Sequence, residues 1–158
     1  MPEFRTATEN DLDNLLTWTQ ALMAHEQVSK ELELQLAEDI QEQLRNWLDA
    51  LLKSESALFI LAETEDGTPM GCILGLVEFN ANPFTIHTTH GVIQLVWVEP
   101  KYRKDGLASQ LLQYMETTFK ELNIDYMEIS YADGNKEAEA FWNRQGYRSV
   151  SHKSRKYL

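Results

Sequence analysis

The residues best suited to chemistry lie in the segment 103–108, RKDGLA, which follows a hydrophobic run and precedes a stretch with helical periodicity. Gly106 and Ala108 are small, so a ligand can approach the backbone there without meeting side chains. The first N–H groups of a helix have no internal partners and lie at the positive end of its dipole. Two basic side chains at the start of the segment add positive charge. This pattern predicts a phosphate-binding turn, although a plain helix entry with solvated basic residues has the same local sequence.

Elements that would position this turn are predicted along the whole chain. Apolar runs predict strands at residues 2–8, 57–63, 70–79, 92–98 and 124–132, and a final strand within 147–158. Apolar stripes at helical spacing predict helices that begin after Thr8, at Ser29, at Leu107 and at Asn135. Residues 80–90 are polar and predict a loop. This order predicts one α/β domain over residues 1–158, with a mixed sheet and helices on both faces.

The composition excludes several classes of protein. The chain has 158 residues, of which 43% are hydrophobic and 10% aromatic, and this is typical of a globular domain with its own core. Its net charge of −11 argues against nucleic acid or an anionic membrane as the main partner. No apolar run approaches the roughly 20 residues that span a bilayer. The acidic N-terminus does not resemble a signal peptide, and the single cysteine, Cys72, favours a cytoplasmic location.

The charge is distributed unevenly along the sequence. Residues 1–65 carry 4 Lys and Arg against 14 Asp and Glu, whereas residues 66–158 carry 10 against 11. The acidic half includes a group of carboxylates around the junction of the first two predicted helices: Glu26, Glu31, Glu33, Glu38 and Asp39. Such a surface attracts cations and repels acids. The alternative is that these carboxylates are only the solvated faces of two amphipathic helices.

Two longer sequence patterns make the prediction of a phosphate-binding turn more specific than residues 103–108 do alone. Residues 98–112 read V-x-P-x-Y-R-x-x-G-x-A-x-x-L-L, and residues 135–147 read N-x-x-A-x-x-F-x-x-x-x-G-Y. Together with the order of the predicted elements, this combination resembles the GNAT superfamily of N-acetyltransferases over nearly the whole chain. The resemblance implies a central, mostly antiparallel sheet in which two neighbouring strands splay apart.

The resemblance also implies acetyl-CoA as a cosubstrate, with its pyrophosphate in the turn at 103–108 and its pantetheine arm beside the strand at 92–98. Main-chain groups of that strand would pair with the pantetheine arm as they would with an added strand. The residues implied in cofactor binding are Val96, Trp97, Val98, Arg103, Lys104, Asp105, Gly106, Leu107, Ala108, Ser109, Asn135 and Phe141. Asn135 also suits the N-cap of the helix that follows it, and the two roles are compatible.

Many members of the superfamily have a tyrosine one residue after the position of Phe141, where it protonates the leaving thiolate. This sequence has Trp142 there, and an indole cannot donate a proton as a phenol does. Tyr131 and Tyr147 are possible substitutes, although both also fit half-buried packing positions. A thiolate also leaves with the help of water, so the tryptophan does not by itself exclude activity.

A general base is predicted near the mouth of the sheet, where Glu78 and His90 are the preferred candidates. His87 and Glu99 are further candidates, and each of the four also fits an exposed position without a catalytic role. Gln94 stands where relatives often have a glutamate, but its amide cannot act as a base. No group of His, Cys and carboxylate residues has the spacing of metal ligands, so no metal site is predicted.

These observations favour an N-acetyltransferase that moves the acetyl group of acetyl-CoA to a primary amine of a cationic small molecule or peptide, by direct attack in a ternary complex. The alternative is a non-catalytic acyl-CoA-binding sensor or partner-docking module on the same fold, which the tryptophan at position 142 motivates. An enzyme that uses a longer acyl donor is a third possibility. Neither nucleic acid nor a membrane is expected as a partner, and homodimers are common in the superfamily.

Overall fold

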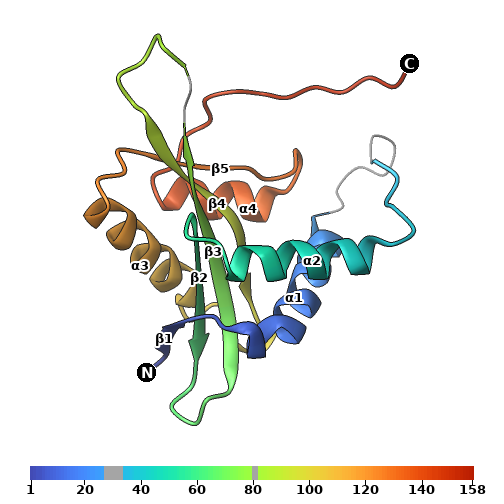
Figure 1. Cartoon of the computed structure of the whole chain (residues 1–158), viewed down its shortest axis with the longest axis vertical. Helices are drawn as coiled ribbons and strands as arrows, with labels where there is room; N and C mark the ends of the chain where they lie inside the picture. The colour runs from blue at the N-terminus through green and yellow to red at the C-terminus, as the bar shows by residue number, and fades with distance from the viewer. Residues whose placement is uncertain (27–33, 80–81) are drawn as a thin grey trace.

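The computed structural model describes residues 1–26, 34–79 and 82–158, which form a five-stranded sheet with helices on both faces (Figure 1). The strands lie in the order β1 (Glu3–Thr6), β2 (Ala57–Glu63), β3 (Pro69–Phe79), β4 (Thr89–Val98) and β5 (Met127–Ile129). The helices are α1 (Leu12–His25), α2 (Ile40–Leu52), α3 (Leu107–Glu121) and α4 (Lys136–Arg144), and short 3-10 turns, η1 (Glu9–Asp11) and η3 (Pro100–Tyr102), precede α1 and α3. Strands β1 to β4 pair antiparallel, and β5 pairs parallel with β4. The predicted α/β class with a mixed sheet is confirmed.

Side chains of the central strands alternate between two apolar layers. In β2, Phe59 and Leu61 belong to a cluster with α1 and α2, whereas Ile60 and Ala62 belong to a cluster with α3 and α4. The first cluster also contains Leu15, Trp18, Leu48, Cys72, Leu74 and Leu95, and the second contains Ile73, Ile93, Val98, Leu107, Leu111, Leu112, Met115, Phe119 and Trp142. Each pair of helices therefore has its own core on one face of the sheet. Among the described residues, no helix has the length and apolar character needed to cross a membrane.

The second helix begins later than the sequence predicts. α2 starts at Ile40, while residues 34–37 have no regular structure and residues 38–39 form a turn. Leu34 and Leu36 are 60% and 54% exposed, so neither has a core to pack against, and helices in proteins are stabilised mainly by such packing. The predicted start at Ser29 lies outside the described residues, as do Glu31 and Glu33.

Two strand predictions near the C-terminus are also corrected. Of the strand predicted at residues 124–132, only Met127–Ile129 forms, because β4 offers it a partner only as far as Ile93. The strand predicted within 147–158 does not form: these residues have no regular structure, and after Tyr147, which packs against Trp142, Figure 1 shows the chain extending away from the helices. Residues 148–158 contain four basic side chains and only one β-branched residue. They therefore have no continuous apolar face to bury against the sheet.

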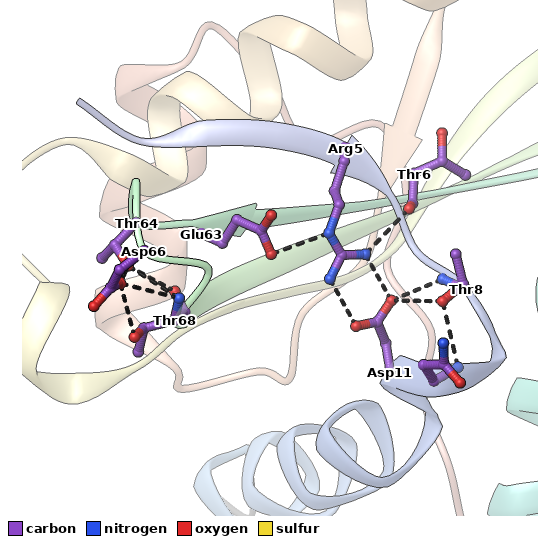
Figure 2. Close-up of polar contacts among 9 residues, drawn as sticks. Arg5, Thr6, Thr8, Asp11, Glu63, Thr64, Asp66 and Thr68 are labelled. Atoms are coloured by element: carbon purple, nitrogen blue, oxygen red, sulfur yellow. Dashed lines mark hydrogen bonds and ion pairs between the residues drawn. The ribbon is translucent and has the colours of Figure 1, made fainter.

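The start of α1 is fixed by an ion pair between Arg5 of β1 and Asp11 (Figure 2). Arg5 Nη1 and Nη2 donate to Asp11 Oδ2 and Oδ1 at 2.8 and 2.9 Å, and Arg5 Nε donates to Glu63 Oε2 at 3.0 Å. Asp11 also accepts from the backbone N–H of Thr8 at 2.8 Å, and the Thr8 side chain caps the turn in return. Asp11 is buried, and the hydrogen bonds from Arg5 hold its pKa below the usual range. The sheet and α1 are thus joined at this point.

Replacing Asp11 with asparagine is expected to destabilise the fold by about 2 kcal/mol at pH 7, because charge-assisted hydrogen bonds to a buried carboxylate are lost. The pKa of Asp11 is lowered in the folded chain by its hydrogen bonds with Arg5. Its contribution is therefore complete above the ordinary carboxyl pKa of about 4 and disappears as the pH falls through the lowered value. Denaturant unfolding at pH 7 and in acid measures both effects.

Asp13→Asn is the matched control for this measurement. The Asp13 carboxylate is 87% exposed in its ion pair with Arg45. Exposed pairs contribute little, so this variant should cost under about 0.5 kcal/mol at either pH. Equal losses for the Asp11 and Asp13 variants would contradict the role assigned to Asp11.

Candidate functional site

The pairing between β4 and β5 ends midway along β4. The two strands pair at three positions only, and the last pair is Ile93 with Ile129. The register between β3 and β4 shifts at this point, so that Gln94 is the extra residue of a β-bulge. Beyond the bulge, residues 94–98 stay beside β3 but have no strand on their other side within the described part of the chain. This opening corresponds to the splayed pair of strands that the resemblance implies.

The hydrogen-bonding groups of β4 divide between β3 and this gap. The backbone N–H of Glu99 donates to the carbonyl of Met70 at 2.9 Å. Partners alternate along an antiparallel pair, so Trp97 also faces β3, whereas the N–H and C=O groups of Val96 and Val98 face the gap. The Val98 carbonyl accepts a hydrogen bond from Nε of the Arg103 side chain at 2.8 Å, which agrees with this assignment. The gap is therefore edged by a strand that can pair with one further extended partner.

Between β4 and α3 the chain forms a turn that suits an anion. Lys104 and Gly106 have φ of 71° and 79°, and left-handed residues next to helical ones are typical of anion-binding nests. α3 begins at Leu107, and the N–H groups of its first turn have no partners within the helix. A Cβ atom on Gly106 would meet nothing within 4 Å, so the space in front of the turn is open. The predicted phosphate-binding turn thus has a backbone geometry that can receive a phosphate group.

A cavity joins the gap and the turn. Its volume is about 600 Å³, which lies in the range of small-molecule sites. Of the twelve predicted cofactor residues, all except Asp105 line it. Asn135 both lines the cavity and caps α4, because its side chain accepts from the N–H of Ala138 at 3.1 Å. The remaining wall residues are Leu22, His25, Glu26, Ile93, Gln94, Leu95, Tyr102, Ser130, Glu137, Ala138, Trp142 and Arg144.

Arg103 and Trp97 form the part of the wall where β4 meets the turn. The Arg103 guanidinium lies over the Trp97 ring, 4.7 Å from its centre, while Arg103 Nε donates to the Val98 carbonyl. The Nη groups of Arg103 have no hydrogen-bond partner among the described residues and remain available to a ligand. Trp97 Nε1 is buried and likewise has no partner in the described part of the chain. This corner therefore offers the Nη donors of Arg103 to a ligand, whereas the Trp97 N–H is enclosed by protein atoms.

Helix α4 lines the cavity and contacts the elements on both sides of it. Just after its end, Gln145 Nε2 donates to Ser109 Oγ in the first turn of α3 at 2.9 Å. Near its start, Glu137 Oε2 lies 3.5 Å from Nε2 of His25, at the end of α1. The cavity is thus bounded by α3 on one side and by α1 on the other, with α4 between them.

The charges of the wall are separated between these two sides. Arg103 and Lys104 lie in the turn before α3, and Arg144 lies next to the residue that bonds to α3. Glu26 and Glu137 lie on the side of α1. Glu26 is half-buried, and this burial raises its pKa. One side of the cavity therefore suits an anion and the other a cation.

Neither tyrosine that was considered in place of Trp142 lies on the cavity wall: Tyr131 and Tyr147 both lie outside it. Tyr147 donates its hydroxyl to Glu116 Oε1 at 2.8 Å, and its burial, together with this bond, raises its pKa. Trp142 lines the cavity, is only 8% exposed and packs edge-to-face against Tyr147. Among the described residues, the tyrosine on the wall is Tyr102 of η3.

The preferred base candidates, Glu78 and His90, lie outside the cavity wall, toward the opposite end of β4 from the turn. β4 begins earlier than predicted, so His90 is a strand residue and not part of a loop. His90 Nε2 lies 3.4 Å from Glu78 Oε2, and its ring stacks on Tyr126. β4 is flanked there by β3 and by the start of β5, which leaves no gap beside it. A catalytic role for this pair stays a prediction, without support from the cavity.

Three ionisable residues of the wall were not singled out by the sequence: His25, Glu137 and Arg144. Glu137 and Arg144 lie four residues before and three after Phe141, and this spacing places all three on one face of a helix. The pattern around Phe141 was therefore a usable signal for both. His25 reaches the cavity only through the packing of α1, for which no local pattern exists. No three His, Cys, Asp or Glu side chains of the described residues come together as metal ligands.

A family model matches most of the chain. The model of the acetyltransferase (GNAT) family matches residues 19–147, which include the bulge in β4, the turn before α3 and all of α4. No curated protein matches the sequence.

Solved structures match the fold over nearly its full length. A GCN5-related N-acetyltransferase from Ralstonia eutropha has a TM-score of 0.81 and 21% identity, and the match covers 99% of both chains. A predicted acetyltransferase from Clostridium acetobutylicum, crystallised with acetyl-CoA, has a TM-score of 0.79 and 17% identity over 100% of this chain and 97% of that one. An aminoglycoside 6′-N-acetyltransferase from Acinetobacter haemolyticus has a TM-score of 0.73 and 19% identity, with 99% of both chains covered. At these identities the likeness is one of fold.

We expect Gly106→Ala to weaken the binding of acetyl-CoA at least about tenfold, which corresponds to about 1.4 kcal/mol. The new methyl group would occupy the open space in front of the turn, where a phosphate would approach the backbone. Calorimetric titration with acetyl-CoA measures the change.

Gly67→Ala is the matched control for this substitution. Gly67 lies in the turn between β2 and β3, its φ is 81° against 79° for Gly106, and its Cβ would also meet nothing within 4 Å. The two variants carry the same kind of backbone strain, but only Gly106 lines the cavity. Equal affinities for the two variants would place the phosphate groups elsewhere.

Proposed function

The chain belongs to the acetyltransferase (GNAT) family, and on that premise we propose that it transfers an acetyl group from acetyl-CoA to a primary amine of a cationic acceptor. The observation that carries this proposal is the cavity that joins the gap beside β4, the turn before α3 and the acidic end of α1. Such a cavity can hold a thioester and an amine together. The transfer then proceeds by direct attack in a ternary complex, in which proximity supplies much of the rate.

The residues of the gap and the turn fit acetyl-CoA as the cosubstrate. Its pyrophosphate oxygens would accept hydrogen bonds from the N–H groups of the turn, and Arg103, Lys104 and Arg144 would supply positive charge. The amide groups of its pantetheine arm would pair with the backbone of Val96 and Val98. The structural neighbour from Clostridium acetobutylicum, which was crystallised with acetyl-CoA, supports this choice.

The chemistry needs one group that stabilises charge and one that accepts a proton. The amine nitrogen attacks the thioester carbonyl, so that a C–N bond forms and the C–S bond breaks. An N–H group of Val96 or Val98, both of which face the gap, would stabilise the negative charge on the carbonyl oxygen. Glu26 would take the proton that the ammonium group must lose, and its raised pKa makes it a stronger base than an exposed carboxylate. The leaving thiolate would be protonated by water, because the Trp142 indole cannot serve as the acid.

A cationic acceptor follows from the separation of charge along the cavity. Glu26 and Glu137 line the side of α1, away from the basic side chains of the turn. Glu38 and Asp39 lie in the turn that leads into α2, and both are exposed. Carboxylates on the cavity wall raise the local concentration of cations there. Acceptors of this kind include polyamines, aminoglycoside-like molecules and lysine-containing peptides, and the neighbour from Acinetobacter haemolyticus is an aminoglycoside N-acetyltransferase.

The second candidate is a module of the same fold that binds an acyl-CoA without turning it over. Trp142 at the usual tyrosine position, with Tyr131 and Tyr147 outside the cavity wall, is the observation that favours it. A cytoplasmic location, which the single cysteine favours, and a homodimeric state stay predictions.

Thiol release from acetyl-CoA with a panel of amines tests the proposal. We expect turnover of cationic amines, with kcat/KM falling as salt rises, because the Debye length shrinks from about 10 Å at 0.1 M to about 3 Å at 1 M. A best substrate that is neutral or acidic, with kinetics independent of salt, would contradict the cationic acceptor. Binding of acetyl-CoA without turnover of any amine would favour the non-catalytic module.

Glu26→Gln is expected to lower kcat/KM for the best amine by about a hundredfold, because it removes both a proton acceptor and a negative charge from the cavity. Glu55→Gln is the matched control, since Glu55 is an exposed carboxylate in the turn between α2 and β2 and does not line the cavity. Steady-state kinetics of both variants measure the effect. An unchanged kcat/KM in Glu26→Gln would remove Glu26 from the reaction.

A further inference from the structure

The turn that leads to the phosphate-binding site is tied to α1 by one hydrogen bond between side chains far apart in the sequence. Nε1 of Trp18, in the middle of α1, donates to Glu99 Oε1 at 2.5 Å. Trp18 is 3% exposed and belongs to the apolar cluster between α1, α2 and the sheet. Neither residue lines the cavity. The contact therefore lies behind the ligand site and not within it.

Among the described residues, both groups in this hydrogen bond would lack a partner without it. A buried indole N–H without a partner costs free energy, and so does a partly buried carboxylate. Glu99 is half-buried and forms no ion pair with the described residues, so the indole N–H is the donor that holds its side chain in place. A hydrogen bond to a charged acceptor is stronger than one between neutral groups. The contact thus fixes the Glu99 side chain to a residue that the core itself holds in position.

The backbone of Glu99 connects the sheet with the turn. Its N–H donates to the carbonyl of Met70 at 2.9 Å, which is the last bond between β3 and β4. Its carbonyl accepts from the N–H of Tyr102 at 2.9 Å, which is the first bond of the turn. The position of Glu99 therefore determines where the turn at residues 103–106 lies relative to the sheet. A displacement here would move the N–H groups of the turn relative to the Val96 and Val98 edge of β4.

Trp18 also stands in line with the cavity residues of α1. Leu22 and Glu26 follow it at intervals of four residues, which places all three along one side of the helix. Leu22 and Glu26 line the cavity, whereas Trp18 reaches the turn through Glu99. Helix α1 thus lines the proposed acceptor side of the cavity. Through the Trp18–Glu99 hydrogen bond it also contacts the residue that precedes the phosphate-binding turn.

We propose that Trp18 is a positioning residue for the cosubstrate, acting through Glu99 on the turn that binds phosphate. This inference rests on the proposed function, since it assumes that the turn binds the pyrophosphate of acetyl-CoA. It assigns Glu99 the role of an anchor for the turn and not that of the general base. The role differs from simple core packing, because the N–H donor matters and not only the volume of the ring.

Trp18→Phe tests the proposal, because it keeps an aromatic ring in the core and removes the donor. We expect the Kd and the KM for acetyl-CoA to rise about tenfold, which is about 1.4 kcal/mol. At saturating acetyl-CoA, kcat and the KM for the amine should stay within about twofold of wild type, since the reacting groups are unchanged. Amide hydrogen exchange of residues 103–109 in the free protein should be faster than in wild type.

Trp47→Phe is the matched control, because Trp47 of α2 packs against the same apolar cluster and its indole has no hydrogen-bond partner among the described residues. It should lower the melting temperature to a similar degree, with an unchanged Kd for acetyl-CoA and unchanged exchange of residues 103–109. Glu99→Leu should reproduce the Trp18→Phe phenotype, and the double variant should bind acetyl-CoA no more weakly than either single variant. If Trp18→Phe fails to fold, Glu99→Leu provides the same two readouts.

Several results would overturn the positioning role. A Kd for acetyl-CoA within twofold of wild type in a folded Trp18→Phe or Glu99→Leu variant would do so, as would unchanged amide exchange of residues 103–109. A Glu99→Gln variant that binds acetyl-CoA normally but loses kcat more than a hundredfold would instead make Glu99 a catalytic residue. Failure of the wild-type protein to bind acetyl-CoA would reject the proposed function, and the amide exchange of the free variants would still decide whether Trp18 holds the turn.

Discussion

The end of the pairing between β4 and β5 at Ile93 is the constraint on which the rest of the site depends. Strands inside a sheet normally have their N–H and C=O groups satisfied on both sides, and groups left without partners cost free energy when they are buried. Here the bulge at Gln94 and the short β5 leave the backbone of Val96 and Val98 facing a gap. The same strand leads directly into the turn at residues 103–106. An extended ligand with amide groups and a phosphate end therefore meets both parts of its site along one continuous stretch of chain.

The two apolar layers hold this gap open from opposite faces of the sheet. The layer of α3 and α4 carries the turn, its positive side chains and Glu137, and the layer of α1 and α2 carries Glu26. Two side-chain contacts connect α1 with elements around the site: His25 with Glu137 of α4, and Trp18 with Glu99 at the end of β4. The ion pair of Arg5 with Asp11 fixes the start of α1 to the edge of the sheet. The position of α1 would therefore matter to both proposed substrates, although only Leu22 and His25 of the helix, with Glu26 just after it, line the cavity.

What the sequence could predict depends on how far each signal reaches along the chain. The turn at 103–108 and the cap at Asn135 were predictable, because small residues, charge and helix periodicity act within a few positions. Glu78 and His90 lie beside the half of β4 that pairs with β5, and the gap lies beside the other half, so the pair is outside the cavity wall. Which half of β4 pairs with β5 is decided by the packing of the sheet and is not encoded near either residue. Trp18 and Glu99 lie 81 positions apart, so only packing brings them together. The strand predicted within residues 147–158 does not form for a similar reason, since the sheet of the described residues provides no partner for it.

Residue-resolved amide hydrogen exchange, with and without acetyl-CoA, tests most directly whether the free edge of β4 and the turn form one binding site. The amides of Val96 and Val98, together with those of residues 104–109, should become protected when acetyl-CoA binds. The amide of Trp97 should change little, because the alternation of β4 already directs it toward β3. Binding of acetyl-CoA that leaves Val96 and Val98 unchanged, or that protects Trp97 in their place, would contradict this account of the site.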